Sequence, residues 1–165
     1  MNRVIPRADI EKFTAALAEK RRRLAKAEHS TRGYRDADGV WRGGLLSFVR
    51  YFWHILEPGT PFTDGWVLEA ICEHLEAVTF GEITNLLINV PPGFSKSLIT
   101  NCFWPAWEWG AMELSHIRYV TFSYSSSNTQ RDNQRFGDLV ASSEFKAMYP
   151  EVQLRQNGME MVSNY

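Results

Sequence analysis

Lys96 and Ser97 stand side by side where a short loop, containing Pro91, Pro92 and Gly93, gives way to a helical pattern. This pair is typical of loops that bind nucleotide phosphates, because the lysine ammonium contacts the β- and γ-phosphates and the hydroxyl coordinates the bridging Mg²⁺. A helix N-terminus adds unpaired backbone N–H groups and a positive partial charge. These residue types predict a phosphate site, with Mg²⁺ at the serine hydroxyl.

The spacing of this loop departs from the usual GxxxxGK[ST] pattern. Val90 and Ser95 occupy the positions of its two glycines, and Gly93 alone supplies a freely rotating backbone. A serine adopts left-handed backbone angles at a cost of roughly 1–2 kcal/mol, which glycine avoids. The alternative interpretation is an ordinary strand-to-helix turn with an exposed lysine at Lys96.

The elements that must position the loop alternate between strand and helix patterns. Residues 86–90 form a short apolar run that predicts a buried strand, and residues 98–109 predict a helix interrupted by Pro105. A second strand is predicted for residues 117–124 and a further helix for residues 129–142. Strand, loop, helix, strand and helix in this order predict the opening of a parallel α/β sheet.

Amphipathic helices are also predicted before the loop, at residues 45–56 and 65–78, and a short final turn is predicted around Phe145 and Met148. Tryptophans 104, 107 and 109 lie on the helix that follows the loop. Large aromatic side chains dominate core packing, so we expect these three to pack against the sheet.

The order and spacing of these segments resemble the large terminase subunit of tailed bacteriophages. The resemblance is strongest in residues 80–97, which end in Val-Pro-Pro-Gly-Phe-Ser-Lys-Ser and resemble the Walker A region of that family. The flanking segments that also resemble it are residues 48–62, 65–78, 103–110 and 120–125. The resemblance implies an α/β fold of the P-loop NTPase class, RecA-like with three α/β/α layers, preceded by helices and with an incomplete sheet.

The resemblance also implies the ligands of the loop, ATP and Mg²⁺. The residues implied to bind phosphates are Pro92, Gly93, Phe94, Ser95, Lys96, Ser97 and Leu98. Ser97 would also hold the metal, and Trp66 matches the region from which the family contacts adenine. A core position for that tryptophan is the alternative. Many large terminases carry an arginine where this chain has Gly93, so an arginine acting there would have to come from elsewhere.

The function implied by the resemblance is ATP-driven packaging of viral double-stranded DNA, followed by DNA cleavage in a second domain. Its implied partners are the portal protein, the small terminase subunit and further copies in a ring, in the cytoplasm of a bacterial host. ATP hydrolysis also needs an aspartate at the end of an apolar strand and a group that orients water. The strand at residues 117–124 ends in serines instead. We therefore expect the N-terminal part of a longer motor, with those acids beyond Tyr165 and without ATP hydrolysis by this chain alone.

The distribution of charge divides the chain into two predicted parts. Residues 1–43 carry 11 lysines and arginines against 6 acids, whereas residues 44–165 carry 7 against 13. The first part is predicted to be a basic helix followed by a polar linker at residues 29–44, and the second is the ATPase part. Arginines 21, 22 and 23 are candidates for contact with DNA or a partner. A non-enzymatic DNA- or partner-binding protein that uses this helix is the alternative function.

The composition limits the remaining classes of protein. With 165 residues, of which 44% are hydrophobic, the chain can bury one sizeable core, and no apolar run is long enough to cross a membrane. We therefore expect a soluble intracellular protein. Cys72 and Cys102 both lie in apolar helical patterns and are expected to be buried thiols, and His74 lies on another helix face from Cys72, so no zinc site is expected.

Overall fold

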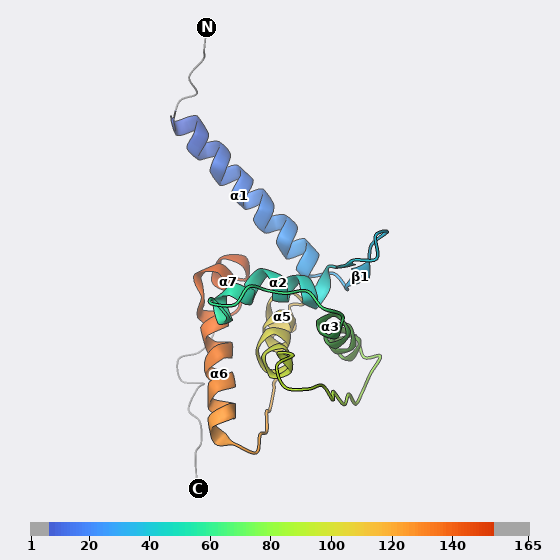
Figure 1. Cartoon of the computed structure of the whole chain (residues 1–165). Helices are drawn as coiled ribbons and strands as arrows, with labels where there is room; N and C mark the ends of the chain where they lie inside the picture. The colour runs from blue at the N-terminus through green and yellow to red at the C-terminus, as the bar shows by residue number, and fades with distance from the viewer. Residues whose placement is uncertain (1–6, 154–165) are drawn as a thin grey trace.

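The computed structural model describes residues 7–153, and helices predominate in this part of the chain (Figure 1). Residues 1–6 of the expected extension and residues 154–165 of the expected ATPase part lie outside the described residues. The elements, in chain order, are α1 (Arg7–His29), β1 (Tyr34–Arg35), β2 (Trp41–Arg42), α2 (Gly44–Leu56), α3 (Trp66–Thr79), α4 (Lys96–Leu98), the π-helix η1 (Ile99–Phe103), α5 (Trp104–Gly110), α6 (Ser126–Ala141) and α7 (Ser143–Met148).

Every helix that the sequence patterns predict is present, and from α2 onward the ends differ from the predicted ones by up to three residues. The patterns at residues 45–56 and 65–78 correspond to α2 and α3, the pattern at 129–142 corresponds to α6, and the final turn is α7. Their apolar faces drive these helices together, since burial of such a face stabilises a helix more than its intrinsic propensity does. The helical expectation is therefore confirmed.

One continuous helix follows the loop, although an interruption at Pro105 is expected. The segments α4, η1 and α5 join without a break, because Leu98, Ile99, Phe103 and Trp104 all keep right-handed helical angles. Proline lacks an N–H group and its ring clashes with the carbonyl one turn earlier. The wider π-helical turn directly before Pro105 accommodates the proline, so the helix continues to Gly110.

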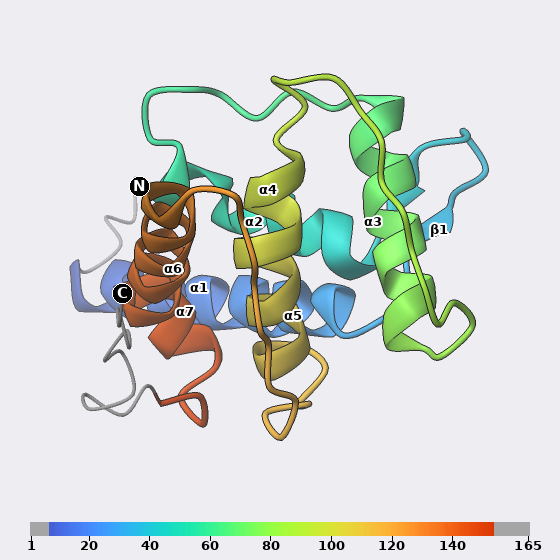
Figure 2. The same cartoon turned by 90° about the horizontal axis from the view of Figure 1, so that it is seen from below.

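The core lies around α2, with α3, α5 and α6 packed beside it (Figure 2). Its largest fully buried side chains include Phe48, Phe52, Trp107 and Tyr149. Helix α1 covers this layer with its C-terminal end, where buried His29 contacts Tyr149 Oη through Nδ1 at 3.0 Å. The N-terminal part of α1 projects away from the body (Figure 1).

The segment expected to be a linker forms an antiparallel hairpin, β1 paired with β2. Its Trp41 is buried, and the carboxylate of Glu76 on α3 accepts hydrogen bonds from Gly33 N at 2.7 Å and Leu45 N at 2.8 Å. Burial raises the pKa of Glu76, while the two N–H groups oppose that shift. The expected boundary at residue 43 therefore lies between the hairpin and α2, which Glu76 connects.

The two expected strands at residues 86–90 and 117–124 are extended but not paired. Within residues 7–153 the sheet consists of β1 and β2 alone. Both segments run in the same direction along the face of the helical layer that lies away from α1 (Figures 1 and 2). The expected parallel sheet is thus not formed as a hydrogen-bonded ladder, because neither segment has a neighbouring strand.

The tryptophans of the helix after the loop divide between the two faces of that helix. Trp104 and Trp109 pack against Tyr119 of the second extended segment, with ring centroids 6.0 and 6.1 Å from it. Trp107 points the other way, and its Nε1 donates to the carbonyl of His29 at 2.7 Å. Two of the three therefore pack against the second extended segment, although no sheet forms there, and Trp107 lies in the helical core.

Candidate functional site

The loop before α4 turns through two residues with left-handed backbone angles. Gly93 has φ 96°, and Ser95, which immediately precedes the helix, has φ 52° and ψ 19°. Ser95 thus takes the angle that a glycine provides in the usual pattern, at the cost expected for a residue with a Cβ atom. Lys96 then becomes the first residue of the helix.

This turn leaves a row of backbone donors without acceptors. Within the described residues, no hydrogen-bond acceptor is found for the N–H groups from Gly93 to Leu98, and the first helical bond joins Ile99 N to Ser95 O at 3.0 Å. Lys96 is half-buried and forms no ion pair in this part of the chain. Unpaired N–H groups and an uncompensated ammonium together are suited to an anion such as phosphate.

A cavity of about 370 Å³ lies between this loop and the connection from α2 to α3. The loop residues Gly93, Phe94 and Ser95 line one side, and Trp66, the first residue of α3, lines the other. Trp66 is 78% exposed, so it is not a core residue. The structure therefore brings the expected adenine-side residue together with the tip of the expected phosphate loop.

The other expected loop residues lie outside the lining of this cavity. Ser97 is exposed on the first turn of the helix, and Pro92 is exposed on the loop. Leu98 is buried in the core, so its side chain cannot contact phosphate and only its backbone N–H remains available. The cavity thus presents the ring of Trp66 on one side and the tip of the loop, with its unpaired N–H groups, on the other.

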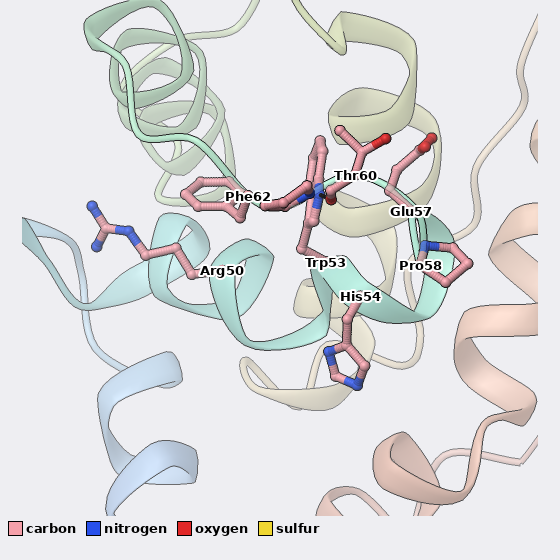
Figure 3. Close-up of a pocket in the computed structure, with 9 residues that line it drawn as sticks. Arg50, Trp53, His54, Glu57, Pro58, Thr60 and Phe62 are labelled. Carbon is pink, nitrogen blue, oxygen red and sulfur yellow. Dashed lines mark hydrogen bonds between the residues drawn. The ribbon is translucent and has the colours of Figure 1, made fainter.

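Trp53 of α2 is a wall of the cavity that the sequence patterns do not single out. Its Nε1 donates to Thr60 O at 2.8 Å, and its ring meets Phe62 edge to face at 5.3 Å (Figure 3). These contacts hold the loop of residues 57–62 against α2, where a second hollow of about 360 Å³ opens next to His54. Trp53 therefore separates the two hollows and fixes the shape of the first.

Asp64 is the one charged residue in the described lining of the cavity. Asp64, which lines the cavity, pairs with Arg50 at 2.6 Å, and Arg50 also donates to the Trp41 carbonyl at 2.9 Å. Arg50 thus compensates the charge of Asp64, whose side chain is 59% exposed. The described lining offers shape, aromatic surface and N–H donors, which suit binding more than proton transfer.

A second polar cluster connects the helix after the loop with α6. Asn101 Nδ2 donates to Asp132 Oδ2 at 2.9 Å, and Arg131 pairs with the other oxygen of Asp132 at 3.0 Å. Thr100 Oγ1 donates back to Lys96 O at 3.0 Å. Asp132 is therefore held as a structural link, which no pattern in the sequence indicates.

The three arginines expected to contact DNA or a partner have different surroundings. Arg22 pairs with Glu19 at 2.8 Å and donates to Ala147 O at 3.2 Å, so it fastens α1 to α7. Arg23 also pairs with Glu19, whose pKa these two arginines lower to about 2, with Arg22 as the larger cause. Arg21 is exposed and forms no hydrogen bond within residues 7–153.

The remaining titratable groups do not assemble into a metal site in the described structure. Cys72 is buried, which raises the pKa of its thiol, and His74 is exposed with Nδ1 2.7 Å from Ala70 O. Among residues 7–153 no cluster of three or more histidines, cysteines or acids is positioned to hold an ion. In the same part of the chain no helix combines the length and apolar character that crossing a bilayer requires.

Comparison with known proteins finds no relative of this chain. No family model matches the chain, and neither a curated protein nor a solved structure matches it.

Proposed function

We propose that this chain is the nucleotide-binding first part of a large terminase subunit, the ATP-driven motor that packages phage DNA. The observation that carries the proposal is the turn through Gly93 and Ser95, which leaves the N–H groups from Gly93 to Leu98 without acceptors in the described residues and places Lys96 at the start of the helix. A Cβ atom on Gly93 would meet nothing within 4 Å, so no close contact at that position imposes its backbone angle.

The proposed roles follow from the position of each group. The ammonium of Lys96 contacts the β- and γ-phosphates of ATP, the N–H groups from Gly93 to Leu98 bind phosphate oxygens, and the hydroxyl of Ser97 coordinates Mg²⁺. Trp66 offers an exposed aromatic face within the same cavity, which suits a purine base. Each role uses a group that makes no competing ion pair within residues 7–153.

We propose that this chain binds ATP without hydrolysing it on its own. Phosphoryl transfer needs an acid for Mg²⁺ and a group that orients the attacking water. The acid in the described cavity lining is Asp64, and it already forms an ion pair with Arg50. In the parent motor we propose a ring of subunits on the portal protein, with the small terminase subunit and viral double-stranded DNA as partners, in the host cytoplasm.

The test is binding of a fluorescent ATP analogue in the presence of Mg²⁺. Lys96→Ala should weaken binding at least about tenfold, which corresponds to about 1.4 kcal/mol. Lys146→Ala is the matched control, because Lys146 lies on α7 outside the loop and should leave binding unchanged. Trp66→Ala should weaken binding by a few-fold without changing the Mg²⁺ dependence.

Two outcomes would contradict the proposal. Equal losses in Lys96→Ala and Lys146→Ala would show that charge alone attracts the nucleotide, and absence of any binding would remove the phosphate site altogether. A separate assay for released phosphate tests the second part of the proposal. Mg²⁺-dependent ATP turnover that disappears in Lys96→Ala would show that the chain is a complete ATPase.

A DNA- or partner-binding role for α1 is the second candidate function. Its support is that α1 projects from the body (Figure 1) and that Lys20 and Arg21 are exposed on it. DNA binding that weakens steeply with salt and persists in Lys96→Ala would favour this role. In that case neutralising Lys20 and Arg21 together should abolish it, whereas Arg22 is needed to hold α1 in place.

A further inference from the structure

Trp53 contacts two parts of the chain that meet at the cavity. On one side lies the connection from α2 to α3, where Nε1 donates to Thr60 O at 2.8 Å and the ring meets Phe62 edge to face at 5.3 Å (Figure 3). On the other side the ring stacks on Phe103, with 6.1 Å between the centroids and 13° between the planes. Phe103 lies about two turns after Lys96 in the same continuous helix. A single indole therefore joins the connection to the helix of the phosphate loop.

Trp53 is the buried anchor of this connection. It is 8% exposed, whereas the ion pairs that Arg135 and Arg50 form at the two ends of the connection are partly exposed. Ion pairs of that kind contribute little, because water and salt screen them. Between those ends, the hydrogen bond from Trp53 is the one that joins the connection to a helix in the described part of the chain.

The connection is stiff, so one anchor sets the position of a large part of it. Pro58 and Pro61 have fixed φ angles, and Thr60 is restricted to extended angles because it precedes a proline. Four residues from Thr60 to Asp64 line the cavity, opposite the tip of the phosphate loop. This wall of the cavity is thus held at Thr60.

We propose that Trp53 is a positioning residue of the nucleotide site, and that it holds this wall where a nucleoside contacts it. The inference rests on the proposed function, because it concerns the same cavity. The phosphate donors do not need Trp53, since they belong to the turn at Gly93 and Ser95. Their helix also packs on α2 and α6, so it keeps its place without the stacking contact. The intact site therefore prefers a nucleoside triphosphate to a bare polyphosphate.

The test compares two ligands of the full chain by isothermal titration calorimetry, ATP and inorganic tripolyphosphate, each with Mg²⁺. Trp53→Phe keeps an aromatic ring and removes the Nε1 donor. Affinity for ATP should fall about fivefold, the effect of one lost hydrogen bond, and affinity for tripolyphosphate should change less than about twofold. The ratio of the two affinities is the readout, because a general loss of stability would not change it.

Trp107→Phe is the matched control. Trp107 is also buried and also donates from Nε1 to a backbone carbonyl, that of His29 at 2.7 Å, but it lies outside the lining of the cavity. Both substitutions should lower the free energy of unfolding, and only Trp53→Phe should change the ratio. Phe62→Leu alters a half-buried ring on the connection and should change the ratio in the same direction.

An unchanged ratio in Trp53→Phe, or an equal change in Trp107→Phe, would overturn the positioning role and leave the proposed function standing. Wild-type binding of ATP that is no tighter than that of tripolyphosphate would overturn it as well, because the wall would then contribute nothing. Absence of binding for both ligands would remove the proposed function and this inference with it. If Trp53→Phe does not fold, the ratio measured for Phe62→Leu decides the outcome.

Discussion

Ser95 combines a functional position with an unfavourable backbone conformation. Its φ of 52° places it in the left-handed region, and it is one of two described residues other than glycine with positive φ, the second being Glu113 at φ 58°. Strain of this kind persists where the surroundings enforce it, often at a binding loop. The angle at Ser95 allows the chain to turn directly into the helix at Lys96.

Replacement of Ser95 by glycine should stabilise the protein. Relief of the left-handed angle contributes roughly 1–2 kcal/mol, and the greater freedom of glycine in the unfolded chain offsets about half of it. We expect a net gain of about 1 kcal/mol in the free energy of unfolding, measured by urea denaturation. Affinity for the ATP analogue should stay the same or increase, since this serine contributes only its backbone to the proposed site.

Glu113→Gly is the matched control for that substitution, because Glu113 has nearly the same φ but lies outside the cavity lining. Both variants should gain stability, and any increase in nucleotide affinity should be confined to Ser95→Gly. A loss of stability in Ser95→Gly alone would mean that its side chain makes a contribution larger than the strain.

At the level of elements, Glu76 fastens three parts of the chain with one carboxylate. It lies on α3 and accepts N–H groups from Gly33, before the hairpin, and from Leu45 in the first turn of α2. Gly44 lies against it with φ 63°, and a methyl group there would overlap both the carboxylate and the backbone of Gly33. The absence of a side chain at Gly44 is therefore required for the junction to form.

Gly44→Ala should destabilise the protein strongly. The left-handed angle costs roughly 1–2 kcal/mol, and displacement of a buried carboxylate from its two donors costs about 1–3 kcal/mol more. We expect a total loss of about 3–4 kcal/mol in the free energy of unfolding. Gly39→Ala isolates the backbone term, because Gly39 has φ 76° but nothing within 4 Å of its Cβ position. Equal losses in the two variants would mean that the contact with Glu76 has no energetic role.

The sequence suffices to predict the helices but not the pairing of the strands. Amphipathic spacing is a local signal, which explains why α2, α3 and α6 lie close to their predicted positions. Pairing depends on a neighbouring strand, about which residues 86–90 carry no information. The hairpin was expected to be a linker because its order comes from distant Glu76 and from burial of Trp41, neither of which leaves a local pattern.

The candidate site was predictable to a similar degree. The residue types at Lys96 and Ser97 and the left-handed turn follow from the loop sequence, and the resemblance indicates Trp66. The cavity that joins them depends on how the loop of residues 57–62 folds back onto Trp53, which is a tertiary contact. The pairing of Arg50 with Asp64 is also tertiary and determines that the cavity has no free acid in its described lining.

At the level of the whole molecule, His29 joins three helices that are distant in sequence. It ends α1, its carbonyl accepts from Trp107 of α5, and its ring contacts Tyr149 directly after α7. Burial lowers the pKa of the His29 imidazole to about 4, with the nearby Glu28 charge opposing the shift. The ring is therefore neutral at the centre of this junction at neutral pH.

Acidification should destabilise the protein through this histidine. An unfolded histidine takes up a proton below about pH 6.5, whereas the folded chain takes it up only near pH 4. The stabilisation is thus complete above the unfolded pKa and is lost as the pH falls through this window. We expect His29 to remove about 1–2 kcal/mol from the free energy of unfolding between about pH 7 and pH 5.

Urea denaturation at both pH values checks this expectation. The measured quantity is the change in the free energy of unfolding between the two pH values, compared between the wild type and each variant. Burial raises the pKa values of Glu76 and Glu108, so protonation of these two carboxyl groups on acidification increases the free energy of unfolding. This increase partly masks the decrease that His29 causes. His29→Gln should remove the acid-dependent loss while its amide still reaches the Tyr149 hydroxyl. Tyr149→Phe keeps His29 buried and should retain the loss. Identical pH dependence in wild type and His29→Gln would show that the junction does not discriminate against the charged imidazole.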